Sequence, residues 1–289
     1  MRVLNLTPHF WPYADLGGDI QPLQNTLFPS GCEVRFELPE DFGARLDPDG
    51  KVLLTVRIAS TDCLMKVVLA ADALKRVKEV TGTELFMPYF PYARQDRVMA
   101  PGHPLSVRVV AEMVNACGFD RVRIFDPHSD VTPALLNNAE VISNHAFVGQ
   151  VLHGQENYLV MSPDAGAFKK IQKLCEAIGY TGEVETVSKS RDVKTGHMIV
   201  KVPSRDYEGR DVYIIDDIGE GCTSFMLIAQ QLRAMNVGRV NLIVSHGILS
   251  GKAEENLRGT IDQVYTTDSF PGARFDFVKE YRLCSSILI

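Results

Sequence analysis

The sequence predicts an α/β protein of two similar domains, each with a mostly parallel sheet flanked by helices. Short β-rich runs alternate with amphipathic helical windows, which is the pattern of parallel α/β layers. The alternation begins again in the second half of the chain. The 289 residues, 45% of them hydrophobic, are enough to bury a core in each domain.

The first half contains two helices and two strands in alternation. Apolar residues recur at helical spacing over 65–80, and a strand is expected over 85–90. A second helix over 106–117 stops at Gly118, a natural helix C-cap. The next strand, 122–125, runs directly into Asp-Pro-His.

The second half repeats this order. The elements expected there are strand 158–162, helix 168–178, strand 212–215, helix 225–235 and strand 240–245. A polar stretch that includes Asn144 separates the halves, so we expect domains over residues 1–145 and 146–289.

Composition excludes several classes of function. The formal net charge is −6 and no dense basic stripe is present, so a nucleic-acid partner is not expected. The chain has neither an 18-residue apolar run nor a signal-peptide pattern at its N-terminus, so a membrane partner is not expected either. Six scattered cysteines without a CxxC pair fit a reducing cytoplasm.

Three strands end in loops that carry acidic or histidine residues: FDPHSD (125–130), SPDAGA (162–167) and IIDDIGEGCTS (214–224). Parallel α/β sheets bind ligands at the carboxyl ends of their strands, where such side chains converge. One Asp after a strand is often only a helix N-cap, but three such loops indicate a binding site.

The adjacent Asp216 and Asp217 are the most informative of these residues. Two neighbouring carboxylates repel each other unless cations or hydroxyl donors are present. They stand before a short glycine-bearing loop that opens a helix, whose N–H groups favour phosphate. The arrangement is typical of a phosphoribosyl-binding site.

The segment PYFPYARQDR (88–97) places Arg, Gln and Asp after a predicted strand. Arg and Gln can address phosphate groups and the edges of adenine. An ordinary exposed loop would explain neither the aromatic run nor its position at a strand end.

These motifs resemble the phosphoribosyl pyrophosphate synthetase (ribose-phosphate pyrophosphokinase) family. YFPYARQDR, FDPHS, SPDAG, IIDD and SHGILSGKA match its segments in order, between about residues 33 and 270. The resemblance implies two phosphoribosyltransferase-like domains, an N-terminal one that binds ATP and a C-terminal one that binds ribose phosphate. It also implies an enzyme that moves the β,γ-diphosphate of ATP to the anomeric hydroxyl of ribose 5-phosphate, releases AMP and uses Mg²⁺.

The resemblance also implies residue roles. ATP would be bound by Phe36, Glu40, Arg94, Gln95, Asp96 and Arg97, of which Phe36 and Glu40 match a hairpin that reaches a neighbouring subunit in a homo-oligomer, a dimer or hexamer. The implied Mg²⁺ ligands are His128 and Asp164, and the implied catalytic residues are Lys189, Arg191 and His128. The acceptor would be bound by Asp216, Asp217, Glu220, Gly221, Cys222, Thr223 and Ser224.

The acceptor loop departs from the family pattern Asp-Asp-x-x-Asp-Thr-Gly-Gly-Thr. Cys222 and Thr223 stand at its two glycines, and their Cβ atoms make positive φ costly. The loop is therefore expected to wrap a 5-phosphate differently. This leaves ADP-ribose, which keeps a free anomeric hydroxyl and has a larger 5′ group, as an alternative acceptor.

Two further readings remain. A non-catalytic regulatory homologue would be expected to lose ATP-binding or catalytic-loop residues, whereas this chain keeps Arg94, His128 and Lys189. A phosphoribosyltransferase that consumes the diphosphate product would share the Asp-Asp loop but would not need YFPYARQDR.

Overall fold

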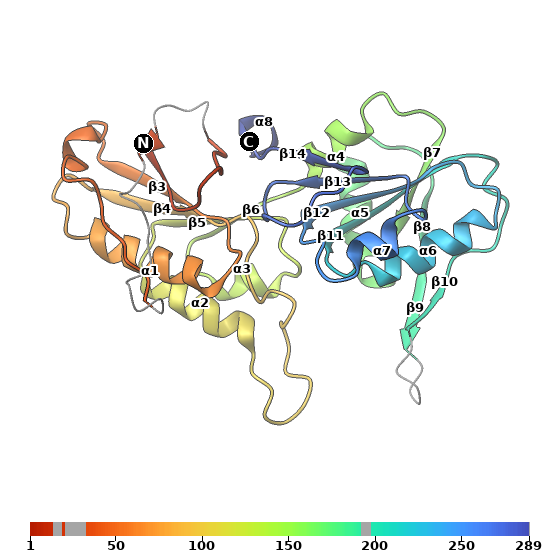
Figure 1. Ribbon diagram of the computed structural model, residues 1–289, viewed down its shortest axis with the longest axis horizontal. Coiled ribbons are helices and arrows are strands. Elements are labelled where there is room, and N and C mark those ends of the chain that lie inside the picture. Colours follow the sequence, from red (N-terminus) through yellow and green to blue (C-terminus); the bar gives the residue numbers. More distant parts are fainter. Residues whose placement is uncertain (14–18, 21–32, 192–197, 289) are drawn as a thin grey trace. The chain divides into compact units, whose positions relative to one another are not determined.

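A computed structural model describes residues 1–13, 19–20, 33–191 and 198–288 (Figure 1). The chain forms two compact units, Met1–Ser143 with Leu283–Ile289, and Asn144–Arg282. The first unit ends close to the expected boundary at residue 145. The C-terminal segment, expected in the second domain, groups with the first unit.

The first unit is built on a six-stranded sheet in the order β2-β1-β3-β4-β5-β6, and every pairing in it is parallel. Its strands are β1 (Arg2–Asn5), β2 (Asp19–Ile20), β3 (Lys51–Thr55), β4 (Gly82–Phe86), β5 (Arg121–Phe125) and β6 (Ala139–Ile142). Its helices are η2 (Gly43–Arg45), α1 (Thr61–Leu74), α2 (Ser106–Ala116), α3 (Val131–Leu135) and α8 (Ser285–Leu288).

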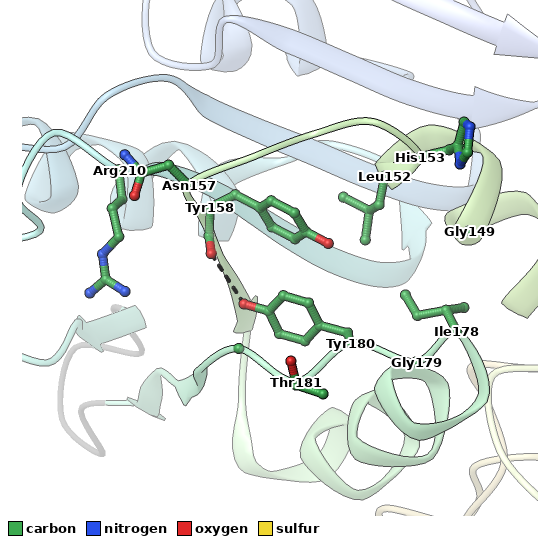
Figure 2. Close-up of a pocket in the computed structure, with 11 residues that line it drawn as sticks. Gly149, Leu152, His153, Asn157, Tyr158, Ile178, Gly179, Tyr180, Thr181 and Arg210 are labelled. Carbon is green, nitrogen blue, oxygen red and sulfur yellow. Dashed lines mark hydrogen bonds between the residues drawn. The ribbon is translucent and has the colours of Figure 1, made fainter.

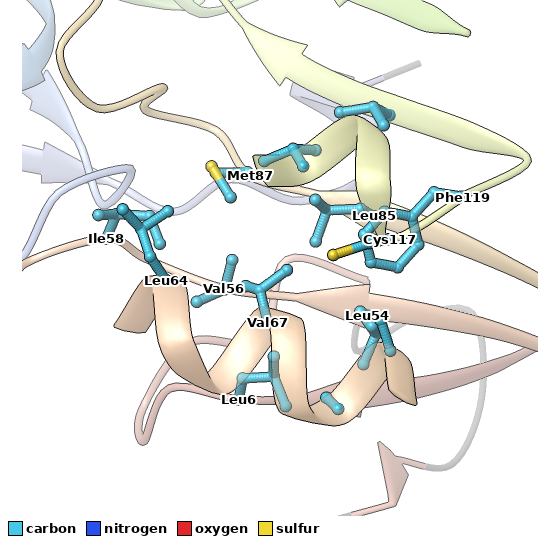
Figure 3. Close-up of a cluster of buried hydrophobic side chains, with 14 of the residues drawn as sticks. Leu6, Leu54, Val56, Ile58, Leu64, Val67, Leu85, Met87, Cys117 and Phe119 are labelled. Carbon is cyan, nitrogen blue, oxygen red and sulfur yellow. The ribbon is translucent and has the colours of Figure 1, made fainter. Parts of the chain in front are cut away.

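Apolar residues on one face of this sheet form the core of the first unit. Leu54 of β3 and Leu85 of β4 pack with Val67 of α1 and with Phe119, and all of these side chains are buried (Figure 3). On β3, Leu53 lies outside this cluster although it is also buried, because successive side chains of a strand point to opposite faces. The sheet is therefore apolar on both faces, as parallel sheets in α/β proteins are.

The second unit has its own six-stranded parallel sheet, in the order β14-β13-β12-β11-β7-β8. Its strands are β7 (Tyr158–Ser162), β8 (Val184–Thr186), β11 (Asp211–Gly219), β12 (Val240–Gly247), β13 (Gln263–Thr267) and β14 (Val278–Tyr281). A separate antiparallel ribbon pairs β9 (Ser188–Arg191) with β10 (Met198–Lys201). Its helices are α4 (His145–Leu152), α5 (Ala165–Ala177), α6 (Thr223–Arg233) and α7 (Ala253–Leu257).

The two central strands of this sheet, β11 and β12, are buried along most of their length. Phe225 and Ile228 of α6 pack on Ile214 and Leu242 in the core cluster. This packing fixes the beginning of α6 directly after β11. The first turn of α6 therefore lies at the same edge of the sheet as the end of β11.

The expected elements are present, with shifted ends. β4 ends at Phe86, before Pro88, since proline lacks the N–H that a sheet ladder requires. The helix expected over 65–80 is α1, which begins after Ser60 and ends at Leu74. β11 continues past 215 to Gly219, because β12 offers pairing partners as far as Gly247. Asp216 and Asp217, which the sequence placed in a loop, therefore lie on the strand itself.

No described helix is long and apolar enough to cross a membrane.

Candidate active site

In the second unit, Asp164 and Lys189 come together at the carboxyl end of β7. Asp164 is the N-cap of α5, and its Oδ1 accepts hydrogen bonds from the N–H groups of Gly166 and Ala167, both at 3.0 Å. Its other oxygen, Oδ2, lies 3.9 Å from Nζ of Lys189. One oxygen of Asp164 thus acts as an ordinary helix cap, while the other faces a cationic side chain.

Asp216 and Asp217 lie at the end of the neighbouring strand, β11. The N–H of Asp217 donates to Oδ1 of Asp216 at 2.9 Å. Burial raises the pKa of Asp216 well above its usual range, and the negative charges of Asp217 and, to a smaller extent, Asp164 raise it further. The three carboxylates therefore make an acidic cluster that a bound cation or hydroxyl donors would stabilise.

The loop between β11 and α6 keeps a left-handed residue where the family has glycine. Cys222 is the N-cap of α6 with φ +59° and ψ +15°, and its side chain is buried. The Cβ of a cysteine disfavours this region, as the sequence predicted, yet the backbone adopts it. Thr223 is already the first residue of the helix. The substitutions have thus not removed positive φ from this loop.

Two hydrogen bonds that the sequence did not indicate hold this loop from the next connection. The N–H of Leu249 donates to the carbonyl of Gly219 at 2.9 Å. Nδ2 of Asn256, on α7, donates to the carbonyl of Gly221 at 2.6 Å. Leu249 lies within the matched segment SHGILSGKA and Asn256 follows it, but no sequence signal distinguishes these two residues from ordinary loop and helix residues.

Lys189 belongs to the antiparallel ribbon. Its backbone pairs with Val200, and that of Arg191 pairs with Met198. Residues 192–197 and the side chain of Arg191 lie outside the described part of the chain. The role predicted for Arg191 therefore stays a prediction.

In the first unit, the segments ARQDR and FDPHS lie against each other. Desolvation works to raise the pKa of Asp96, but the adjacent Ser129 hydroxyl, Arg97 and the His128 ring outweigh it and lower that pKa. Nε of Arg97 lies 3.4 Å from Oδ1 of Asp96. Two motifs about thirty residues apart in sequence thus meet at the carboxyl ends of β4 and β5.

The rest of this segment combines fixed and exposed groups. The Gln95 backbone N–H donates to the Tyr92 carbonyl at 2.9 Å, and the Gln95 side chain accepts a hydrogen bond from the Ser106 hydroxyl. Arg94 is exposed to solvent. A fixed backbone with an exposed guanidinium group is suited to binding a phosphate.

Phe36 and Glu40, the two residues predicted to reach a neighbouring subunit, differ in exposure. Phe36 is half-buried and packs against the core of its own unit, and Glu40 is exposed. Residues 35–39 form no strand in the structure. The contact of Phe36 and Glu40 with ATP in a neighbouring subunit stays a prediction.

The predicted metal ligands come from different units, His128 from the first and Asp164 from the second. Among the described residues, no group of three or more His, Cys, Asp or Glu side chains could hold a metal ion. Mg²⁺ usually keeps several waters and binds through one or two carboxylates together with substrate phosphates. Oδ2 of Asp164, which does not cap α5 and lies within the acidic cluster, suits that kind of site.

A separate hollow of about 440 Å³ lies at the opposite end of β7 (Figure 2). Tyr158, Tyr180 and Arg210 line it, and the Tyr180 hydroxyl donates to the Tyr158 carbonyl at 3.2 Å. No residue predicted from the sequence belongs to its described lining. The candidate site is therefore the carboxyl edge of the sheet rather than this hollow.

Known proteins with similar sequence point to one family. Residues 50–118 match a family model described as the N-terminal domain of ribose phosphate pyrophosphokinase. A ribose-phosphate pyrophosphokinase of Aquifex aeolicus (strain VF5) is 33% identical over 218 residues, which cover 72% of this chain and 67% of that relative. One of Marinomonas sp. (strain MWYL1) is 28% identical over 258 residues, which cover 84% of this chain and 76% of that relative.

A solved structure has the same fold. The crystal structure of phosphoribosylpyrophosphate synthetase from Mycobacterium smegmatis matches 98% of this chain and 94% of that one with a TM-score of 0.79, at 21% identity. This likeness confirms the predicted α/β fold with its two parallel sheets.

Proposed function

The chain belongs to the ribose-phosphate pyrophosphokinase family, as its motifs predicted, and on that premise we propose that it is a diphosphotransferase. It would move the β,γ-diphosphate of ATP to the anomeric hydroxyl of ribose 5-phosphate and release AMP. The observation that carries the proposal is the gathering of Asp164, Lys189, Asp216 and the start of α6 at one edge of the second unit's sheet.

The end of β11 and the start of α6 would bind the acceptor. Asp216 and Asp217 can accept hydrogen bonds from ribose hydroxyls, which would offset the burial and the repulsion from Asp217 that together raise the pKa of Asp216. Glu220, Gly221, Cys222, Thr223 and Ser224 form the loop and first turn whose N–H groups can face the 5-phosphate. The acceptor's C1 hydroxyl would then lie on the acidic side of the loop.

ATP would bind the first unit through the segment from Arg94 to Arg97, beside His128. Mg²⁺ would neutralise charge on the diphosphate, with a carboxylate oxygen of Asp164 as the proposed ligand from the second unit; the part of His128, which belongs to the first unit, stays a prediction. Oδ2 is the oxygen of Asp164 available for this role, because Oδ1 caps α5.

In the transfer itself, the C1 oxygen forms a bond to the β-phosphorus while the bond from that phosphorus to the AMP oxygen breaks. The hydroxyl proton passes to solvent. Negative charge grows on the bridging and equatorial oxygens, and Lys189 with Arg191 would stabilise it. One such cationic contact typically contributes about 10²–10³ in rate.

ADP-ribose remains a second candidate acceptor. Apart from Gly221 and its two chain neighbours, no described residue has a heavy atom within 4 Å of the position that a Cβ on Gly221 would occupy, so one side of the loop is open. Cys222 and Thr223 in place of two glycines also change the loop's surface. An open loop suits a 5′ substituent larger than a phosphate monoester, whereas the retained positive φ of Cys222 favours the family's usual acceptor.

One experiment tests the proposal and the acceptor together. The protein is incubated with ATP, Mg²⁺ and either ribose 5-phosphate or ADP-ribose, and AMP release is followed. We expect AMP with ribose 5-phosphate. AMP with ADP-ribose alone would replace the acceptor but keep the chemistry, and AMP with neither would favour the regulatory homologue. Self-association into a dimer or hexamer stays a prediction.

A further inference from the structure

Asn256 reaches the acceptor loop from α7. Its Nδ2 lies 2.6 Å from the carbonyl oxygen of Gly221 and 3.2 Å from Oγ1 of Thr223. A carbonyl oxygen can only accept, so the amide nitrogen of Asn256 must face the loop. One side chain thus contacts the residues on both sides of Cys222.

These contacts fix the orientation of the peptide between Gly221 and Cys222. In a trans peptide, the C=O and N–H bonds point in opposite directions. Since the Gly221 carbonyl faces Asn256, the Cys222 N–H faces away from it. The Leu249 N–H holds the Gly219 carbonyl in the same way at 2.9 Å, which turns the N–H of Glu220 away from Leu249.

The orientation is one that Cys222 would not adopt by preference. Its φ of +59° is in the left-handed region, which disfavours a residue with a Cβ. Rotation of the Gly221–Cys222 peptide would return Cys222 to negative φ and turn its N–H round. Such a strained residue persists only where its surroundings hold it, and Asn256 supplies the hydrogen bond that opposes this rotation.

We propose that Asn256 is a positioning residue that holds the Cys222 N–H towards the phosphate of the acceptor. This proposal rests on the proposed function, because it requires the acceptor's phosphate to bind at this loop. Asn256 contacts the loop and not the substrate, so it acts through the peptide that it orients. Cys222 makes the chain depend on Asn256, because glycine could hold the same φ without help.

Steady-state kinetics with ribose 5-phosphate give the first test. Asn256→Ala is expected to raise KM for ribose 5-phosphate about tenfold or more, with KM for ATP changed by less than about twofold. Asn256→Asp, which has the same shape but no donor, is expected to do the same. In a Cys222→Gly background, Asn256→Ala is expected to raise KM less than about threefold. Equal effects in the two backgrounds would overturn the proposal.

The matched control is Asn115→Ala in the first unit. Asn115 also donates to a backbone carbonyl, that of Leu135 at 2.9 Å, and accepts from the N–H of Asn137 at 2.8 Å. Its loss should lower the melting temperature but leave KM for ribose 5-phosphate within about twofold. A KM increase equal to that of Asn256→Ala would mean that the effect is merely structural.

A readout that does not need turnover separates this inference from the proposed function. Cys222 is buried, and burial raises the pKa of its thiol to about 12, so iodoacetamide should label it slowly. Asn256→Ala should speed labelling of Cys222 about tenfold, measured by peptide mass spectrometry, with buried Cys175 as the internal reference.

If the wild-type protein releases no AMP with ribose 5-phosphate, the proposed function fails, and labelling alone then decides whether Asn256 holds the loop. Unchanged labelling in Asn256→Ala overturns the inference in either case. Faster labelling with unchanged KM in an active enzyme also overturns it, because the peptide would then not position the acceptor.

Discussion

Nζ of Lys189 lies 3.9 Å from Oδ2 of Asp164, while Oδ1 of the same carboxylate accepts from the N–H groups of Gly166 and Ala167. The two oxygens of Asp164 thus have different partners. Both side chains are about one-third exposed, at 32% for Lys189 and 36% for Asp164, so the pair itself contributes little to folding stability. Lys189 is therefore held near the acidic cluster without being needed for the fold.

Lys189→Ala should slow turnover about tenfold or more while ATP binding survives, because the ammonium group would act on charge that develops during transfer. Turnover is measured by AMP release and ATP binding by calorimetry. Lys201→Ala on the facing strand is the control, since Lys201 is exposed on the same ribbon. Unchanged turnover in Lys189→Ala would remove this residue from the mechanism.

Asp164→Asn separates the two roles of that residue. Asparagine caps a helix about as well as aspartate, so the melting temperature should hold, but the loss of the charge on Oδ2 should lower activity at limiting Mg²⁺ about tenfold or more. Asp164→Ala should lose activity and also about 1 kcal/mol of stability with the cap. If Asp164→Asn kept wild-type activity across a Mg²⁺ titration, the carboxylate would have no part in metal binding.

Asp216→Asn should stabilise the protein in the absence of ligand, and increasingly so as the pH rises. The folded-state pKa of Asp216 is raised, so its contribution to stability is full below the ordinary pKa of aspartate and is lost as the pH rises through the raised value. Asparagine resembles the protonated form at every pH.

Melting temperatures of the two proteins should therefore nearly coincide near pH 4 and differ by about 2–4 °C or more at neutral pH, with the variant higher. The same variant should lose acceptor binding. A temperature difference that does not change with pH would contradict the raised pKa.

Arg94→Ala should raise KM for ATP about tenfold and leave KM for the acceptor nearly unchanged, because Arg94 is exposed on the segment proposed to bind phosphate. Arg108→Ala on α2 is the matched control. Its guanidinium group is also exposed and pairs only locally with Glu112, at 2.8 Å. If Arg108→Ala lost more ATP affinity than Arg94→Ala, Arg94 would not be the residue that contacts the phosphates of ATP.

Much of the fold was predictable because its strands are apolar and its helices are amphipathic. The strand over 158–162 was predicted with the bounds of β7, and the helix from Ser106 ends one residue from its expected end. The ends of strands that depend on a pairing strand were not predictable. The polar residues Asp216 and Asp217 continue β11 because β12 pairs with the backbone of Asp216 and Ile218, which the side chains of the two aspartates do not reveal.

The candidate site likewise has features that the sequence predicts and features that it does not. Side chains with a chemical signature, such as Asp164 and Lys189, could be proposed from motif and position, and the structure places Oδ2 of Asp164 at 3.9 Å from Nζ of Lys189. The contacts of Leu249 and Asn256 could not be predicted, because they are hydrogen bonds to groups about thirty residues away in the sequence. Such contacts exist only after the chain has folded.

The most direct test of the central claim is the fate of the β-phosphate of ATP. With ATP labelled at that phosphorus, Mg²⁺ and ribose 5-phosphate, the account predicts that the label moves into a sugar diphosphate product as unlabelled AMP appears in equal amount. Label that remains in ADP, or that is released as free diphosphate at a rate independent of the acceptor, would contradict it.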